Sequence, residues 1–115
     1  MGERGNICIQ YHNKKEVFFY THWQGDQLPQ IVQKALRKNL RWKDESYLAR
    51  IIFDTLKGRD TDEELGYGIV PYECDNNYPI VYVNPEAQTV TIEDTEWSFK
   101  EYVVIPDREL NRINE

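Results

Sequence analysis

Two one-sided helical stripes in the middle of the chain limit its possible folds more than any other feature. Apolar residues recur at helical spacing over residues 28–36, with Pro29 in the first turn, where a missing N–H costs nothing. A second stripe covers residues 47–56, where Asp44 can cap the start and Gly58 the end. Each stripe has to be buried against another element, and the flanking segments have strand character. The sequence therefore predicts an α+β fold.

Strand-like segments lie on both sides of the helical pair. Alternating and β-branched residues predict strands within 6–12, 17–23, 67–72, 79–83 and 88–92, and a strand or short helix within 97–105. Because consecutive strands with short turns usually pair antiparallel, we expect a small antiparallel sheet with both helices on one face. One domain, 1–115, would then comprise a hairpin (6–23), two helices (28–57), a meander of antiparallel strands (66–105) and a loose polar tail (106–115).

Size and composition suit one small folded domain. A chain of 115 residues buries roughly two-thirds of its unfolded surface, and three Trp, eight Tyr and four Phe supply large apolar areas. No stretch approaches the roughly 20 apolar residues that cross a bilayer, and the first residues lack a secretory apolar run. Cys8 and Cys74 belong to no metal or redox motif. Two reduced thiols in a cytoplasmic protein are the favoured interpretation, and pairing on neighbouring strands stays the alternative.

Charge is distributed unevenly along the chain. Residues 1–57 carry ten Lys/Arg and six Asp/Glu, a net +4, whereas residues 58–115 carry four and fourteen, a net −10, which together give −6. Such asymmetry indicates either a basic face for an anionic partner or two solvated faces that attract each other weakly.

The end of the second predicted strand is the most distinctive segment. Strand alternation places Tyr20 and His22 on one face and Trp23 on the other, just before a strand-to-helix turn. The N–H groups of such a turn can hold an anion, and Gly25 would let a ligand approach the backbone. The alternative is structural, with the aromatic rings in the core and the imidazole holding the turn.

Cations and a tryptophan also stand at the two helices. Trp42 could stack on a ring and Arg41 could grip a phosphate; alternatively, Trp42 fills the gap between the helix ends and Arg41 pairs with Asp44. Arg50 is either an anion contact or a clamp to Asp54, four residues later.

Several familiar chemistries are disfavoured. Tyr67 lies between two glycines, but neither a dinucleotide-binding nor a phosphate-binding loop has this spacing. His12 and His22 are the only histidines, the cysteines are not clustered, and the acidic run 60–64 lacks calcium-loop spacing, so we expect no metal and no cofactor. An acid–base pair of His22 with Asp75 or a glutamate would need the fold to bring them together. The acidic balance disfavours DNA binding despite a basic cluster of Lys34, Arg37, Lys38, Arg41 and Lys43.

Three segments carry a combined pattern: residues 20–29 (YTHWQGDQLP), 41–53 (RWKDESYLARIIF) and 66–69 (GYGI). Across roughly residues 5–95 this pattern resembles a family of short, uncharacterised proteins of bacteriophages and bacteria. The resemblance implies a bacteriophage or mobile-element setting in a host cytoplasm. The family has no established activity, so no catalytic residues can be carried over from it to this chain. Tyr78 stands before Pro79 where the family has a histidine, which weakens any catalytic role at that position.

Three functions are compatible with these features. The first is a non-catalytic protein that sequesters a small anionic molecule, such as a nucleotide signal of host defence. Its ligand-binding residues would be Tyr20, His22, Trp23, Arg41, Trp42, Arg50 and Tyr67. The second is an interaction module that inhibits or adapts a host protein through the acidic C-terminal half. The third is a small hydrolase that uses His22. An unpaired strand edge would in addition favour a homo-oligomer.

Overall fold

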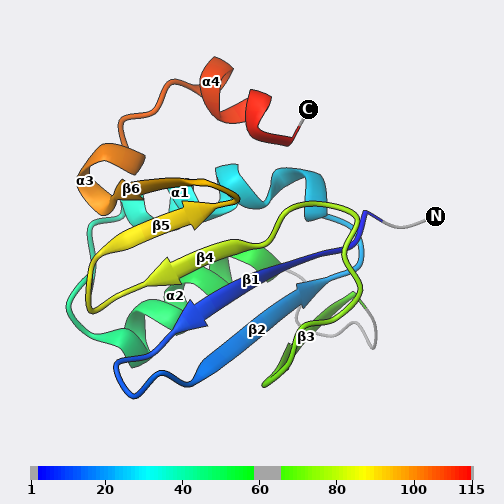
Figure 1. Ribbon diagram of the computed structural model, residues 1–115, viewed down its shortest axis with the longest axis horizontal. Coiled ribbons are helices and arrows are strands. Elements are labelled where there is room, and N and C mark those ends of the chain that lie inside the picture. Colours follow the sequence, from blue (N-terminus) through cyan, green and yellow to red (C-terminus); the bar gives the residue numbers. More distant parts are fainter. Residues whose placement is uncertain (1–2, 59–65, 115) are drawn as a thin grey trace.

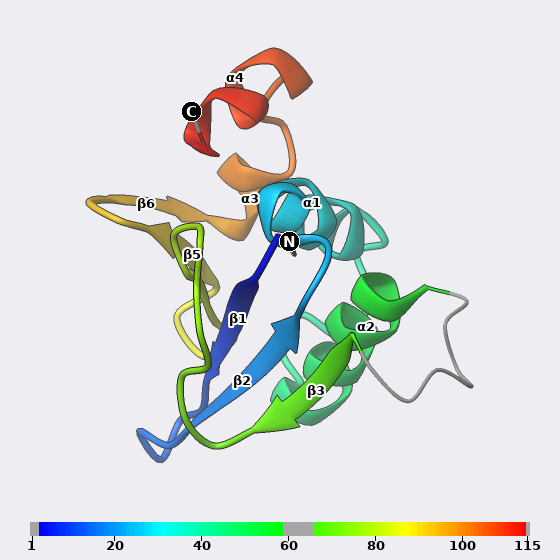
Figure 2. The same cartoon turned by 90° about the vertical axis from the view of Figure 1, so that its right-hand side faces the viewer.

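The computed structural model describes residues 3–58 and 66–114. A six-stranded sheet in the order β3-β2-β1-β4-β5-β6 is covered on one face by α1 and α2, and the C-terminal helices lie at one end (Figures 1 and 2). The strands are β1 (Gly5–Gln10), β2 (Glu16–Thr21), β3 (Tyr67–Val70), β4 (Val81–Asn84), β5 (Thr89–Ile92) and β6 (Thr95–Ser98). The helices are η1 (Gly25–Gln27), α1 (Leu28–Arg37), α2 (Glu45–Lys57), α3 (Phe99–Tyr102), α4 (Asp107–Asn111) and η2 (Arg112–Asn114). The α+β prediction and the placement of both long helices on one face are confirmed.

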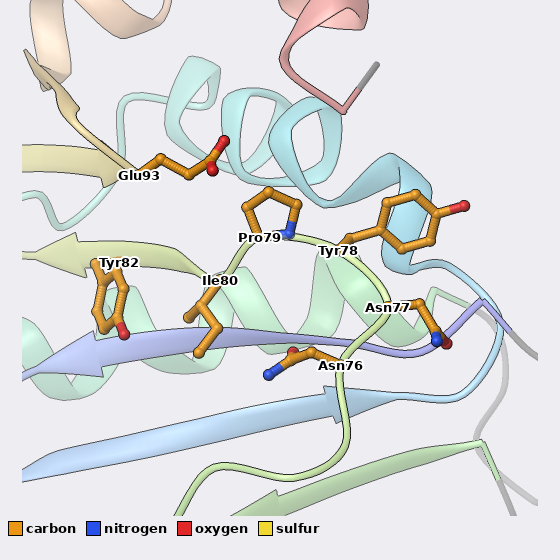
Figure 3. A pocket seen from close by; sticks show the side chains of 7 residues that line it. All are labelled: Asn76, Asn77, Tyr78, Pro79, Ile80, Tyr82 and Glu93. Carbon is orange, nitrogen blue, oxygen red and sulfur yellow. The ribbon is translucent and has the colours of Figure 1, made fainter.

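The sheet is mixed, and this corrects the expectation of an antiparallel one. β1 pairs with β2 antiparallel, but it pairs with β4 parallel, with Ile7 opposite Val81 and Ile9 opposite Val83. β1 lies between β2 and β4, and its residues are buried along most of its length, as is typical of a central strand. The chain after β3 therefore crosses the helix-free face of β2 and β1 before it enters β4 (Figure 3).

The core lies between the sheet and the two long helices. Alternation along the strands directs one apolar set toward the helices, and the helical stripes face it. Its fully enclosed members include Ile7, Ile9, Val81, Val83 and Val90 from the sheet and Leu28, Val32, Leu36, Leu48, Ile52 and Leu56 from the helices. The stripes predicted from spacing are therefore the faces that the structure buries.

The C-terminal segment is docked, and the predicted loose tail is wrong. Leu110 in α4 is fully buried, and the Nε2 group of Gln33 in α1 donates to the carbonyl oxygens of Tyr102 (3.1 Å) and Ile105 (2.8 Å). Segment 97–105 divides into the end of β6 and α3. Polar residues dominate the tail, and its apolar side chains are few, but Leu110 and Ile113 both pack against the core.

A capping box starts α3. The Ser98 hydroxyl accepts from the Glu101 N–H at 3.1 Å, and the Glu101 carboxylate accepts from the Ser98 N–H at 2.8 Å. These hydrogen bonds to Ser98 hold the pKa of Glu101 below its usual range. The Glu101 carboxylate therefore serves to cap the start of α3.

Two buried ionisable groups, the Cys8 thiol and the Tyr102 hydroxyl, make the stability of the fold sensitive to alkaline pH. Burial, and next the Glu16 carboxylate, raises the pKa of the Cys8 thiol far above its ordinary value, and burial also raises the pKa of Tyr102. Both groups ionise at their ordinary pKa in the unfolded chain, so the stability they contribute is complete below about pH 9 and is lost as pH rises beyond it. We expect urea unfolding to show a loss of up to about 1.4 kcal/mol per pH unit and group.

The thiol contribution can be separated with Cys8→Ala. That variant is expected to be less stable at neutral pH, because it leaves a cavity, but its stability should decline less steeply above about pH 9. Identical slopes for the variant and the parent chain would show that Cys8 is not protected from ionisation.

Candidate functional site

A cationic hollow lies where the connection between α1 and α2 meets the start of α3. Its volume is about 520 Å³, and it is lined by Asn39, Arg41, Trp42, Lys43, Gln88 and Lys100. Four of these residues come from the helix connection, one from the turn between β4 and β5, and one from α3. We refer to it below as the cationic hollow.

Left-handed backbone shapes both loops of the cationic hollow. α1 ends as the Asn39 N–H donates to the Leu36 carbonyl at 2.9 Å, and Asn39 and Arg41 then have φ values of 53° and 57°. In the β4–β5 turn Gln88 has φ 56°, and its carbonyl accepts from the Phe99 N–H at 2.8 Å. Half of the lining residues thus hold a conformation that non-glycine residues rarely adopt, and such positions gather at functional sites.

Trp42 forms the inner wall of the hollow. Its indole N–H donates to the Leu36 carbonyl at 3.1 Å, and its ring meets Phe99 edge-on with centroids 5.4 Å apart. The ring therefore packs between the end of α1 and the start of α3. It is half-buried, and its remaining surface lines the hollow.

Three cations face the hollow without an acidic partner. In the described part of the chain, the ion pairs are Arg4–Asp75, His12–Glu45 and Arg50–Asp54, so Arg41, Lys43 and Lys100 take part in none. The expected pair of Arg41 with Asp44 does not form, because the Asp44 carboxylate caps α2 by accepting from the Tyr47 N–H at 3.3 Å. The Arg41 guanidinium lies 4.9 Å from the centre of the Tyr47 ring instead.

Four other predicted residues gather at the opposite edge of the sheet. The Tyr20 hydroxyl lies 3.2 Å from His22 Nδ1, and Trp23 meets His22 and Tyr67 edge-on with centroids 5.9 and 6.1 Å apart. The Tyr67 hydroxyl donates to Gln24 Oε1 at 2.6 Å. These side chains pack on one another beside β3, whereas Trp42 packs against the segment that follows β6. The seven predicted residues therefore do not line one hollow.

The strand-to-helix turn is not open to an anion, which corrects the expectation for this segment. The Gly25 N–H donates to the Glu3 carbonyl at 2.7 Å, and the Thr21 hydroxyl accepts from the N–H groups of Trp23 and Gln24. A Cβ atom on Gly25 would lie 2.6 Å from the Arg4 carbonyl oxygen. Gly25 thus admits the chain's own N-terminal segment, and that segment takes the place expected for a ligand.

The remaining predicted contacts resolve in favour of internal pairs. Arg50 is clamped by Asp54 at 2.6 Å on the exposed side of α2. His22 has Tyr20 as its hydrogen-bond partner, and Asp75 pairs with Arg4 at 3.5 Å, so the anticipated acid–base pair of His22 with Asp75 does not form. The acidic run 60–64 lies outside the described residues, and residues 3–58 and 66–114 contain no cluster of metal-ligating side chains.

Another hollow lies on the helix-free face of the sheet (Figure 3). It measures about 470 Å³ and is lined by Asn76, Asn77, Tyr78, Pro79, Ile80, Tyr82 and Glu93. Its polar groups are largely engaged within the protein: Asn77 Oδ1 accepts from the Arg4 N–H, and the Tyr78 hydroxyl donates to Glu3, which raises the pKa of Tyr78 to about 12. Figure 3 shows Tyr78 and Glu93 on opposite sides of Pro79 rather than converging.

Sequence reasoning missed part of the cationic hollow. Gln88 and Lys100 are distant in sequence from the helix connection, and Lys100 lies in the acidic half of the chain. No local signal places either of them beside Arg41. Sequence reasoning also missed the pair of His12 and Glu45, in which the Nδ1–Oε1 distance is 2.6 Å and the His12 N–H donates to the same carboxylate.

Comparisons with protein-family models, curated proteins and solved structures find no match. The resemblance to short bacteriophage and bacterial proteins therefore remains a prediction. In the described part of the chain, no helix is both long enough and apolar enough to span a membrane.

Proposed function

We propose that the protein binds a small anionic ligand in the cationic hollow. The observation that carries the proposal is the set of three cations, Arg41, Lys43 and Lys100, in a lining without a carboxylate. The whole chain has a net charge of −6, so an excess of positive charge at one hollow is a local departure from the rest of the surface. Anions with two or more negative charges would gain most from it.

The ligand class that fits this lining best is a nucleotide. Arg41 can make a bidentate contact with a phosphate, and the two lysines add mobile positive charges. The carboxamides of Asn39 and Gln88 offer donors and acceptors to a base or sugar, and the exposed part of Trp42 offers an aromatic surface. A volume of about 520 Å³ lies in the usual range of ligand sites.

The proposed role is sequestration rather than turnover. The lining residues are amides, cations and an indole, which hold and orient an anion, and the lining contains no carboxylate, histidine, serine or cysteine of the kind that hydrolytic sites use. In the bacteriophage setting that the resemblance implies, the bound molecule would be a nucleotide signal of the host.

Binding should be measured by thermal shift and calorimetry with linear and cyclic nucleotides. A ligand at 100 times its Kd is expected to raise the free energy of unfolding by about 2.7 kcal/mol. Arg41→Ala and Lys100→Ala should each weaken binding by about tenfold or more. Arg50→Ala is the matched control, since that cation is exposed and paired outside the hollow. Equal losses for all three variants, or no stabilising nucleotide, would overturn the proposal.

A further inference from the structure

A further hollow, which we call the basic hollow, lies on the outer side of α1 beside the C-terminal helix α4. It measures about 370 Å³ and is lined by Gln30, Gln33, Lys34, Arg37, Asp107 and Asn111. Lys34 and Arg37 are exposed and take part in no ion pair of the described residues. Asp107 is the one carboxylate of its lining. This basic hollow is separate from the cationic hollow, and the proposed function makes no use of it.

The helix α3 connects the two hollows. Lys100, in α3, lines the cationic hollow, and Val103 caps the other end of the same helix. The carbonyl of Val103 accepts from Arg37 Nε at 2.8 Å, which brings the Arg37 guanidinium to that end. Lys100 and Val103 are three residues apart, so at about 1.5 Å per residue their backbone positions are separated by roughly 4.5 Å along the helix axis.

Five cations therefore line the two hollows on either side of α3, and we refer to them as the cation row: Lys43, Arg41 and Lys100 in the cationic hollow, and Arg37 and Lys34 in the basic hollow. Acidic residues also lie close to this row. The Glu101 carboxylate is held by the N–H of Ser98, and Asp107 lines the far end. At the other end Lys43 also borders a hollow that is lined by Asp44, Glu45 and Glu86. A ligand confined to the cationic hollow would leave the last two cations of the row unused.

Resting on the proposed function, we infer that the preferred ligand is a short single-stranded oligonucleotide that extends from the cationic hollow along α3 into the basic hollow. Successive phosphates would meet successive cations, a pattern typical of single-strand binding. Trp42 and the amides of Asn39, Gln88, Gln30 and Asn111 lie beside the row, where they offer surfaces and hydrogen-bonding groups to bases. The cations line hollows on either side of a one-turn helix rather than one continuous helical ridge, which disfavours docking in a duplex groove.

The affinity should depend on ligand length and on salt. Fluorescence polarisation with labelled oligothymidylates of about two, four and eight nucleotides is expected to show an affinity at least about tenfold above that of a labelled mononucleotide, with most of the gain reached by the intermediate length. The double variant Lys34→Ala/Arg37→Ala should abolish this gain but leave mononucleotide binding unchanged. Its slope of log affinity against log salt should be smaller by roughly 1.4.

Controls separate charge, folding and ligand chemistry. Lys15→Ala/Lys57→Ala removes the same charge outside both hollows and should keep the length dependence. Lys34→Ala alone preserves the contact of Arg37 with Val103. In this single variant the slope of log affinity against log salt should decrease by about half as much as in the double variant. Arg41→Ala should weaken ligands of every length.

The outcomes distinguish this inference from the proposed function. Mononucleotide binding with no gain for longer strands would overturn the inference and leave the proposed function intact. Equal binding of inorganic polyphosphate of matched charge would overturn it as well, because bases would then play no part. Absence of binding by any of these ligands would overturn both.

Discussion

Replacing Tyr102 with alanine is expected to lower the free energy of unfolding by about 3–5 kcal/mol. Tyr102 is the largest fully buried side chain of the described residues, and its ring meets Trp97 edge-on with centroids 5.4 Å apart. Its truncation leaves a large cavity between α3, α1 and β6, in addition to the lost contacts. Urea unfolding of the variant and the parent chain, compared at equal m-values, measures the difference.

Tyr102→Phe separates the hydroxyl from the ring. The hydroxyl donates to the Pro29 carbonyl at 2.8 Å in a buried position, so its removal leaves that acceptor unpaired and should cost about 1–3 kcal/mol. The ring is retained in this variant, which makes it the matched control for the cavity. A loss below about 1 kcal/mol for Tyr102→Ala would mean that the C-terminal segment is not docked on α1.

The elements that sequence reasoning predicts best are those whose signal is local. The stripe over residues 28–36 and the Asp44 cap need only helical periodicity and capping chemistry, and both occur as expected. The N-terminal hairpin has the same advantage, because its strands are joined by a short turn. Arg41 and Trp42 were identified for the same reason, since they lie in the short connection between two recognisable helices.

Features that depend on distant contacts could not be predicted. The parallel pairing of β1 with β4 joins residues more than seventy positions apart, and nothing in either strand specifies the direction of its partner. Lys100 reaches the cationic hollow only because α3 packs against the helix connection. Trp23 illustrates a different difficulty, because a distinctive aromatic residue in a turn can serve packing as well as binding: its ring contacts Tyr67 edge-on, yet 45% of the residue is exposed.

One buried amide contributes to holding the crossing chain between β3 and β4 on β1. Asn6 in β1 is fully buried, and its side chain accepts from the Cys74 N–H at 3.2 Å and donates to the Cys74 carbonyl at 3.0 Å. The same Nδ2 group also donates to Asn76 Oδ1. A side chain thus pairs with both backbone groups of Cys74, as a neighbouring strand would, and this holds the crossing segment on β1.

Asn6→Ala is therefore expected to destabilise the protein by about 2–4 kcal/mol, because it leaves two partly buried backbone groups without partners. Gln10→Ala, on the same strand, removes a hydrogen bond that is exposed and should change stability by less than about 0.5 kcal/mol. Amide hydrogen exchange should accelerate at Cys74, and also at Asn77, whose N–H donates to the Arg4 carbonyl at 2.8 Å.

Asn6→Asp tests the same clamp through its protonation. The new carboxylate can still accept from the Cys74 N–H, but it faces the Cys74 carbonyl without a proton to donate, so its pKa in the folded state should rise. A raised folded pKa means that stability is greatest below the unfolded pKa, near 4, and falls as the pH increases. The deficit of this variant relative to the parent chain should accordingly be smaller at about pH 4 than at about pH 7, whereas that of Asn6→Ala should not change. A deficit of Asn6→Asp that is independent of pH would show that the Cys74 carbonyl does not depend on this donor.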